Sequence, residues 1–134
     1  MTGSTTPNPK PTRFMEACGL VVNEVSPTHV TGWIDLTADF HQPFGIVHGG
    51  VYASAVESAA SMGATAAVSD KGLIAVGVNN NTNFLRSMTE GRVIIEARAI
   101  SQSRTQQLWE VEITDEQDRL VATGQLRLQN VTPR

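Results

Sequence analysis

The sequence predicts an α+β domain in which one long buried helix packs against about six antiparallel strands. Residues 49–69 hold apolar side chains that recur at helical spacing and spread well beyond one stripe. The segments on either side alternate between apolar and polar residues, as strands with one buried face do. A sheet that covers so broad an apolar helix must curl around it.

The sequence pattern of the first third of the chain predicts a tail, a hairpin and a loop. Residues 1–13 are rich in Thr and Pro and lack an apolar centre, so we expect a disordered tail before a single domain of residues 14–134. Residues 19–36 alternate around the turn sequence SPTH, which predicts two paired strands. Pro43 and Gly45 break the pattern in residues 38–47, which predicts a loop leading into the helix.

The last part of the chain predicts four strands. After the turn sequence SDKG, segments 73–87, 92–102, 105–114 and 119–129 alternate with period two. The connections TEG, SQSR and DEQD are too short for the crossovers that parallel strands need. We therefore expect consecutive strands to be antiparallel neighbours.

The composition excludes several classes of function. A formal net charge of -3 gives no electrostatic reason to bind nucleic acid or anionic lipid, so we expect neither partner. Serines and a glutamate in the long helix make membrane insertion unfavourable. The single cysteine, Cys18, suits a reducing compartment, so we expect a cytoplasmic protein. His29, His41 and His48 share no metal-ligand spacing, so no metal site is expected.

One carboxylate interrupts the long apolar helix. Glu57 is the only ionisable residue between Gly49 and Ser69, and burying a carboxylate without a partner is unfavourable. We therefore expect Glu57 to face a cleft or an interface. A purely structural salt bridge to an arginine is the alternative.

Two glycines stand where the helix is predicted to begin. The first amides of a helix have no intrahelical acceptor and lie at the positive end of its dipole, so the amide of Gly49 or Gly50 can hold an oxyanion. No Lys-Ser or Lys-Thr follows them, which excludes a nucleotide phosphate loop, and no Gly-x-Ser-x-Gly elbow is present. His48 alone is more often a packing or capping residue than a catalyst.

The spacing along this helix points to a site shared between two chains. Gly49 and Glu57 are eight residues apart, which separates them by roughly 12 Å along the axis at about 1.5 Å per residue. Both cannot act on one carbonyl from the same helix. If Gly49 binds an oxyanion and Glu57 is the base or nucleophile, they come from different copies in a two-fold dimer. Ser61, one turn after Glu57, could orient a water or be a small packing residue.

Three segments resemble a known family. HQPFGIVHGGVYASAVESAASMGA, VGVNNNTNFLRSMTEGRV and EVEITDEQDRLVATGQLRL resemble the hotdog-fold acyl-CoA thioesterases of the 4-hydroxybenzoyl-CoA and phenylacetyl-CoA (PaaI-like) type, over about residues 18–130. The resemblance implies a hotdog fold and hydrolysis of an aromatic or medium-to-long-chain acyl-CoA. Coenzyme A is then part of the substrate, and no cofactor is expected. A homodimer with shared sites, assembled into a homotetramer, is also implied.

The resemblance also implies roles for single residues around the reacting carbonyl. Gly49 would give the oxyanion amide, in a pocket that His48 and Gln42 shape. Glu57 of the facing subunit would be the general base or the nucleophile toward the thioester carbonyl. Ser61 occupies the place where the family often has a threonine that helps to hold the attacking water.

The coenzyme A end is expected where strands end. The resemblance places the nucleotide phosphates there, and arginine suits phosphate oxygens; many members have proline where this chain has Ser87. One alternating set of side chains from residues 79–84 should also line the cleft or interface. The candidates for binding the substrate are Arg86, Ser87, Ser103, Arg104 and Asn83.

Two other functions stay open. A hotdog hydratase or dehydratase also uses a histidine and an acidic residue across a dimer, but its usual HFP and PG surroundings are missing here. A non-catalytic module that binds acyl-CoA is possible on the same fold, and the intact acidic position argues against it.

Overall fold

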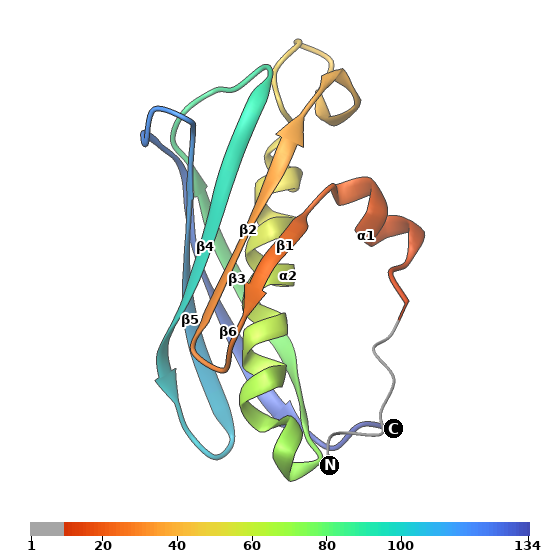
Figure 1. The fold of residues 1–134 in the computed structure, drawn as a ribbon, viewed down its shortest axis with the longest axis vertical. Coiled ribbons are helices and arrows are strands. Elements are labelled where there is room, and N and C mark those ends of the chain that lie inside the picture. The colour runs from red at the N-terminus through yellow and green to blue at the C-terminus, as the bar shows by residue number, and fades with distance from the viewer. Residues whose placement is uncertain (1–9) are drawn as a thin grey trace.

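A computed structural model describes residues 10–134 of the chain (Figure 1). Its elements are α1 (Arg13–Cys18), β1 (Val21–Val25), β2 (His29–Leu36), α2 (Gly49–Val68), β3 (Ile74–Phe84), β4 (Gly91–Gln102), β5 (Gln106–Thr114) and β6 (Leu120–Val131), with short 3-10 turns at Ala38–Phe40 and Ser69–Lys71.

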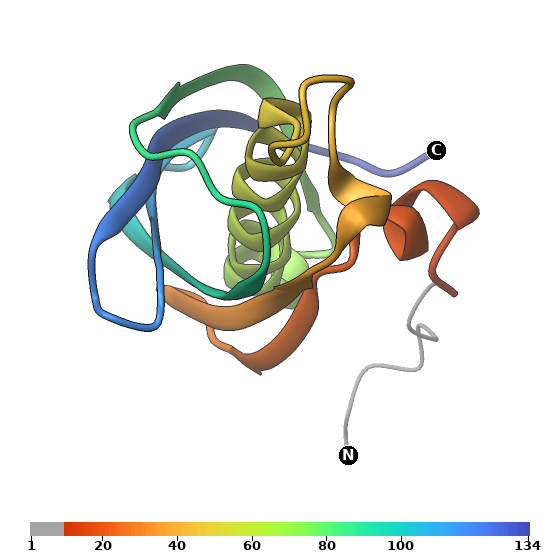
Figure 2. The ribbon, with the colours of Figure 1, turned by 90° about the horizontal axis from the view of Figure 1, so that it is seen from above.

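The expected architecture is confirmed. One six-stranded sheet in the order β1-β2-β4-β5-β6-β3 has only antiparallel pairs. Figure 2 shows this sheet curving around α2. The core forms where the inner faces of the strands meet α2, and Trp109, Ile95 and Val56 are among its fully buried side chains. Within residues 10–134, no helix combines the length and hydrophobicity that crossing a bilayer requires.

The start of the chain differs from the sequence analysis. Residues 1–9 of the expected tail lie outside the described residues. Arg13 already belongs to α1, a short helix that the sequence analysis did not predict. Thr12 caps this helix by accepting a hydrogen bond from the amide of Met15 at 3.2 Å, and Gly19 ends it with a φ of 77°.

The expected neighbours of β3 were wrong. β3 pairs with β6 at the edge of the sheet, and β4 pairs with β2. The regular ladder ends at Phe84, and the amides of Leu85 and Arg86 both donate to the carbonyl of Val121. The connection to β4 is therefore six residues long, 85–90, and it crosses the end of the sheet near the start of α2. Alternation alone did not show where β3 ends.

A glycine lets α2 approach the sheet closely. A Cβ on Gly63 would lie 2.3 Å from Cη2 of Trp109, which is fully buried. The indole is held in place by a hydrogen bond of 2.9 Å from its Nε1 to Gln107. The side chain of Gln107 in turn donates to the carbonyl of Ala64 in α2. Neither the helix nor the indole has room to accept a methyl group.

We expect Gly63→Ala to destabilise the fold by about 1–3 kcal/mol, the usual cost of overpacking a core. Helix propensity alone would predict a gain of about 1 kcal/mol, so the sign of the change separates the two effects. Urea unfolding measures it. Phenylalanine at position 109 lacks the indole atoms that the new methyl group would meet. In a Trp109→Phe background, Gly63→Ala should therefore lower the free energy of unfolding by less. A stabilised Gly63→Ala variant would contradict this packing argument.

Asp115 closes the turn between β5 and β6. Its side chain is 1% exposed and accepts hydrogen bonds from the amides of Gln117 and Arg119 and from Nε of Arg119, at 2.9, 2.9 and 2.7 Å. Burial disfavours the charged carboxylate, but the hydrogen bonds from Arg119 and Gln117 outweigh it, so the pKa of Asp115 is lowered from its ordinary 3.8.

The lowered pKa of Asp115 predicts that the fold loses stability in acid. Because its folded-state pKa is depressed, Asp115 stabilises the fold above its unfolded pKa, and the contribution is lost as the pH falls through the folded value. We expect Asp115→Asn to lower Tm at neutral pH, with a gap to wild type that closes below about pH 4. Thermal melts followed by circular dichroism test this. Asp118→Asn is the control, because Asp118 is exposed in the same turn and asparagine tolerates its φ of 64°. A gap that is independent of pH would contradict the assignment.

Candidate active site

Three segments converge where α2 begins. They are the loop before the helix, the first turns of α2, and the chain that leaves β3 (Figure 1). Between them lies a cavity of about 310 Å³. Four of the residues expected from the sequence, Gln42, Gly49, Arg86 and Ser87, line it together. The other lining residues are Ile46, Val47, Tyr52, Phe84 and Leu85.

His48 caps α2 and leaves one backbone amide free. Its Nδ1 accepts the amide N–H of Gly50 at 2.8 Å, and its own amide donates to the carbonyl of Phe40 at 2.8 Å. Because Nδ1 accepts, neutral His48 carries its proton on Nε2. The amide N–H of Gly49 has no acceptor among the described residues. It stands at the positive end of the helix dipole and is available to an oxyanion.

The loop before α2 is fixed to the β3–β4 crossover. Nε2 of His41 lies 2.7 Å from the carbonyl of Thr89, and the amide of Val47 donates to the carbonyl of Met88 at 2.9 Å. Within the loop, the side-chain oxygen of Gln42 accepts the amide of Phe44. That bond orients the carboxamide and leaves its NH₂ group as a donor at the cavity.

Gly49 lies under an aromatic ring. A Cβ on Gly49 would be 2.4 Å from the ring of Phe84, whose centroid is 6.1 Å from that of Tyr52. A side chain at this position would therefore have to displace the ring of Phe84, and glycine also allows a substrate to approach closely. Phe84 is 56% exposed, so its ring has room to move.

Glu57 stands at the edge of the sheet, eight residues further along α2. Its side chain is exposed, and its carboxylate lies 3.7 Å from the position that a Cβ on Gly77 of β3 would take. It forms no salt bridge with any residue in 10–134, so the structural alternative finds no support there. Asn80 donates to the carbonyl of Ala53 at 2.9 Å, which ties α2 to β3 one turn before Glu57.

Some expected residues are not brought to the cavity within one chain. Ser61 is half-buried on α2, one turn after Glu57. Ser103 and Arg104 form the β4–β5 hairpin, where the side chain of Asn130 donates to both of their carbonyls at 3.1 Å. This hairpin lies at the far end of β4 from the crossover that carries Arg86. Asn83 alternates with Thr82 and Phe84, which face α2, so it lies on the outer face of the sheet.

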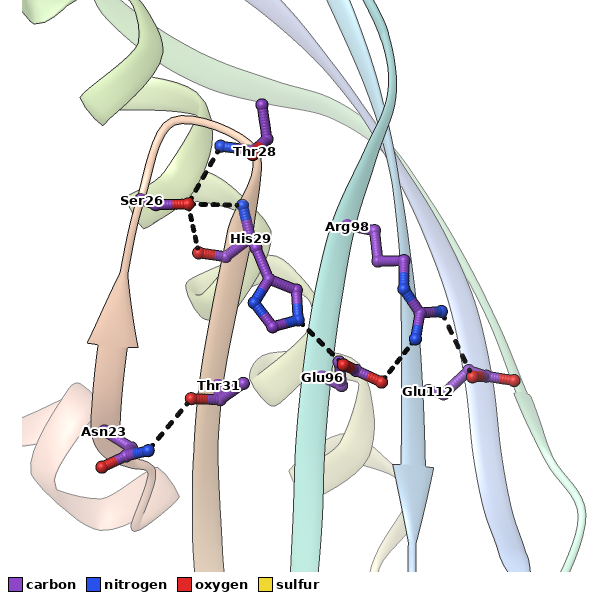
Figure 3. Close-up of polar contacts among 8 residues, drawn as sticks. All are labelled: Asn23, Ser26, Thr28, His29, Thr31, Glu96, Arg98 and Glu112. Atoms are coloured by element: carbon purple, nitrogen blue, oxygen red, sulfur yellow. Dashed lines mark hydrogen bonds and ion pairs between the residues drawn. The ribbon is translucent and has the colours of Figure 1, made fainter.

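A polar cluster on the outer face of the sheet is separate from this site. Figure 3 shows His29 on β2, Glu96 and Arg98 on β4, and Glu112 on β5. Glu96 lies 2.8 Å from His29 and 2.6 Å from Arg98. These side chains are between 36% and 51% exposed, and such pairs typically contribute at most about 1 kcal/mol. The cluster links neighbouring strands. Across residues 10–134, no three His, Cys, Asp or Glu side chains are grouped to hold a metal ion.

Tyr52 is the residue at the cavity that sequence reasoning missed. It is 2% exposed, and burial raises its pKa to about 12. Its hydroxyl has no hydrogen-bond partner among the described residues. A signal was present in the sequence, because Tyr52 is the only aromatic residue in a helix of mostly small side chains and follows Gly49 by three positions.

Comparisons with known proteins agree with this arrangement. The sequence profile of the Thioesterase superfamily matches residues 44–122. A Mycobacterium tuberculosis protein named "Putative esterase Rv1847" is 45% identical over 123 residues, 90% of this chain and 88% of its own. Its solved structure superposes with a TM-score of 0.87 over 92% of this chain and 99% of that one.

Two further proteins are named for thioester hydrolysis. The 1,4-dihydroxy-2-naphthoyl-CoA hydrolase of Listeria monocytogenes is 35% identical over 108 residues, which is 81% of this chain and 87% of its own. The structure of thioesterase HI1161 from Haemophilus influenzae has 25% identity and a TM-score of 0.82, over 89% of this chain and 82% of that one. The fold, the profile match and these relatives agree: this chain belongs to the thioesterase superfamily and is a thioester hydrolase.

Proposed function

We propose that this protein hydrolyses an acyl-CoA thioester to the free acid and coenzyme A, at sites that two copies of the chain share. The observation that carries the proposal is the placement of two unpartnered groups on one rigid helix. The amide of Gly49 opens on a cavity, and the carboxylate of Glu57 stands exposed at the sheet edge. A continuous α2 keeps them apart within one chain.

The partner that completes the site is a second copy docked on β3. This strand is an edge of the sheet, so one side of its backbone is open to pairing. It also exposes apolar side chains, with Ile74, Val76 and Val78 at 36%, 43% and 51% exposure. Exposed apolar edge strands of this length are templates for pairing with another chain. An antiparallel pair of β3 strands would satisfy the open backbone groups of both edges.

The position of the two-fold axis follows from which β3 residues lie beside the two groups. The carboxylate of Glu57 lies beside Gly77, and Gly49, which carries the free amide, lies beside Phe84. β3 has one extra residue at a bulge between Gly77 and Asn79. When two β3 strands pair about a two-fold axis, Gly77 of one copy therefore faces Phe84 of the other if the axis passes at Asn81. Each carboxylate then approaches the free amide of the other copy, which gives two equivalent sites per dimer.

The chemistry follows from these groups. The N–H of Gly49 would hold the thioester carbonyl oxygen as it becomes an oxyanion, beside the NH₂ group of Gln42 and Nε2–H of His48. Glu57 of the facing subunit would take a proton from the attacking water or attack the carbonyl carbon itself. The coenzyme A thiolate leaves in either case. Ser61 lies one turn from Glu57, where its hydroxyl could hold the water.

The two ends of the substrate would lie on either side of this carbonyl. Arg86 and Ser87 line the cavity and are exposed, which suits the phosphates of coenzyme A. Ser103 and Arg104 stay candidates for the same role. An apolar groove of about 380 Å³ between α1, β1 and α2 includes Met62 and would take the acyl group. On α2 it is lined by Ser54 and Ser58, which are three residues before and one residue after Glu57.

The nature of the acyl group is also a proposal. The Listeria relative is named for an aromatic acyl-CoA, which supports aromatic esters of the 4-hydroxybenzoyl and phenylacetyl type as first substrates. Medium-to-long-chain esters would use the same groove. We also propose that two dimers form a homotetramer and that the protein acts in the cytoplasm.

Thiol release from aromatic, short-chain and long-chain acyl-CoAs tests the function. Light scattering of the purified protein reports whether it is a dimer or a tetramer. We expect thiol release from at least one aromatic or longer ester and no change in enoyl absorbance. If the panel releases no thiol while the esters still raise Tm, the protein binds acyl-CoA without hydrolysing it, and the proposal is wrong.

A further inference from the structure

The hydroxyl of Tyr52 is an unused donor inside the proposed active site. The hydroxyl is buried, and no described residue accepts its hydrogen bond. A buried polar group without a partner is costly, so such groups in folded proteins are usually satisfied by a water or a ligand. With a pKa of about 12, the phenol stays protonated and can donate to an incoming acceptor.

Its position in the cavity restricts what that acceptor is. Tyr52 lines the same cavity as Gly49, at the proposed oxyanion end, and Arg86, at the proposed phosphate end. Side chains on a helix lean toward its N-terminus, so the phenol of Tyr52 points toward the end of α2 where this cavity lies. The neighbouring wall is apolar, with Ile46 and Val47.

The arm that joins a thioester to the phosphates of coenzyme A matches this wall. Starting from the sulfur, it has two methylenes and then an amide, followed by two more methylenes and a second amide. The methylenes suit the apolar lining, and an amide carbonyl is the acceptor that a neutral phenol needs. The amide nearest the sulfur is only a few bonds from the carbonyl held at Gly49.

One side chain is a close neighbour of both residues. The ring of Phe84 lies over Gly49 and against Tyr52, and it is 56% exposed. A ligand arm that displaces this ring would come close to both Gly49 and Tyr52. The buried, unpartnered hydroxyl is thereby explained without an additional residue.

We propose that Tyr52 is a substrate-binding residue whose hydroxyl donates a hydrogen bond to the amide carbonyl nearest the sulfur in the arm of an acyl-CoA. The inference rests on the proposed function and adds to it a specificity for thioesters that carry this amide. Truncated substrates that lack the amide lose this contact, and those that lack only the nucleotide keep it.

The test compares three thioesters of the acyl group that the wild type hydrolyses best. They are the coenzyme A ester, the N-acetylcysteamine ester, which keeps only the amide nearest the sulfur, and the ethyl thioester, which has none. We expect Tyr52→Phe to lower kcat/KM about three- to tenfold on the first two, the range for one hydrogen bond between neutral groups. On the ethyl thioester the variant should equal wild type. Thermal stability without ligand should stay equal or rise, because the change removes an unsatisfied hydroxyl.

A matched variant separates the two ends of the arm. Arg86→Ala should lower kcat/KM more on the coenzyme A ester than on the N-acetylcysteamine ester, whereas Tyr52→Phe should lower it to the same extent on both. Equal activity of Tyr52→Phe and wild type on all three esters would overturn the inference, and so would an equal loss on all three. Those results leave the thioesterase proposal standing, whereas a wild type that hydrolyses none of the esters overturns both.

Discussion

Glu57→Gln is expected to lower kcat for thioester hydrolysis by about a hundredfold to ten-thousandfold, the contribution of a general base. The change keeps the size of the side chain and removes its charge, so neither proton abstraction nor direct attack by a carboxylate remains. The fold should be unaffected, because Glu57 is exposed and makes no salt bridge among the described residues. Initial rates of thiol release and Tm measure the two effects separately.

A matched control keeps this prediction specific. Glu24→Gln removes the same charge from an exposed position on β1, at the other edge of the sheet. We expect wild-type rates from that variant. Glu57→Gln with more than a tenth of wild-type kcat would show that Glu57 is neither the base nor the nucleophile. The exposed carboxylate would then need another explanation.

Gly49→Pro is expected to lower kcat by about a hundredfold to a thousandfold, the usual effect of removing one oxyanion donor. Proline has no N–H, yet it is favoured at the first position of a helix. His48, with φ of -66° and ψ of 132°, already has the conformation that a residue before proline prefers. The helix should therefore form with its oxyanion donor missing.

Gly49→Ala is the control for crowding. Both variants place a Cβ against the ring of Phe84, but alanine keeps the N–H. Because Phe84 is partly exposed, its ring can shift in both variants at similar cost. The ratio of kcat for Gly49→Ala to kcat for Gly49→Pro then measures the contribution of the amide N–H alone. Equal activity of the two variants would mean that the amide of Gly49 does not bind the oxyanion.

Local pattern predicted the elements of this fold well. The apolar run of residues 49–69 predicted α2 (Gly49–Val68), and period-two segments predicted all six strands. The place of β3 in the sheet could not be predicted, because pairing with β6 depends on contacts far apart in the sequence. α1 was missed because its six residues are too few for a periodic signal and bury no side chain.

The candidate site was predictable only in part. The free amide at a helix start and the lone carboxylate Glu57 follow from sequence and helix geometry. The packing of Phe84 over Gly49 and the orphaned hydroxyl of Tyr52 do not, because they require the crossover after β3 to return to the start of α2. Arg86 reaches the cavity through the same crossover, whereas Arg104 is carried to the other end of the fold.

The shared site is tested most directly by mixing Gly49→Pro and Glu57→Gln subunits after each has been shown to fold and to be inactive. A mixed dimer contains one intact site, built from Gly49 of one copy and Glu57 of the other. With random exchange at equal amounts, half of the dimers are mixed, and one of the two sites in each mixed dimer is intact. The account therefore predicts recovery to about a quarter of wild-type activity. Native mass spectrometry would verify the exchange. Mixed dimers that form and stay as inactive as their parents would contradict a site shared between subunits.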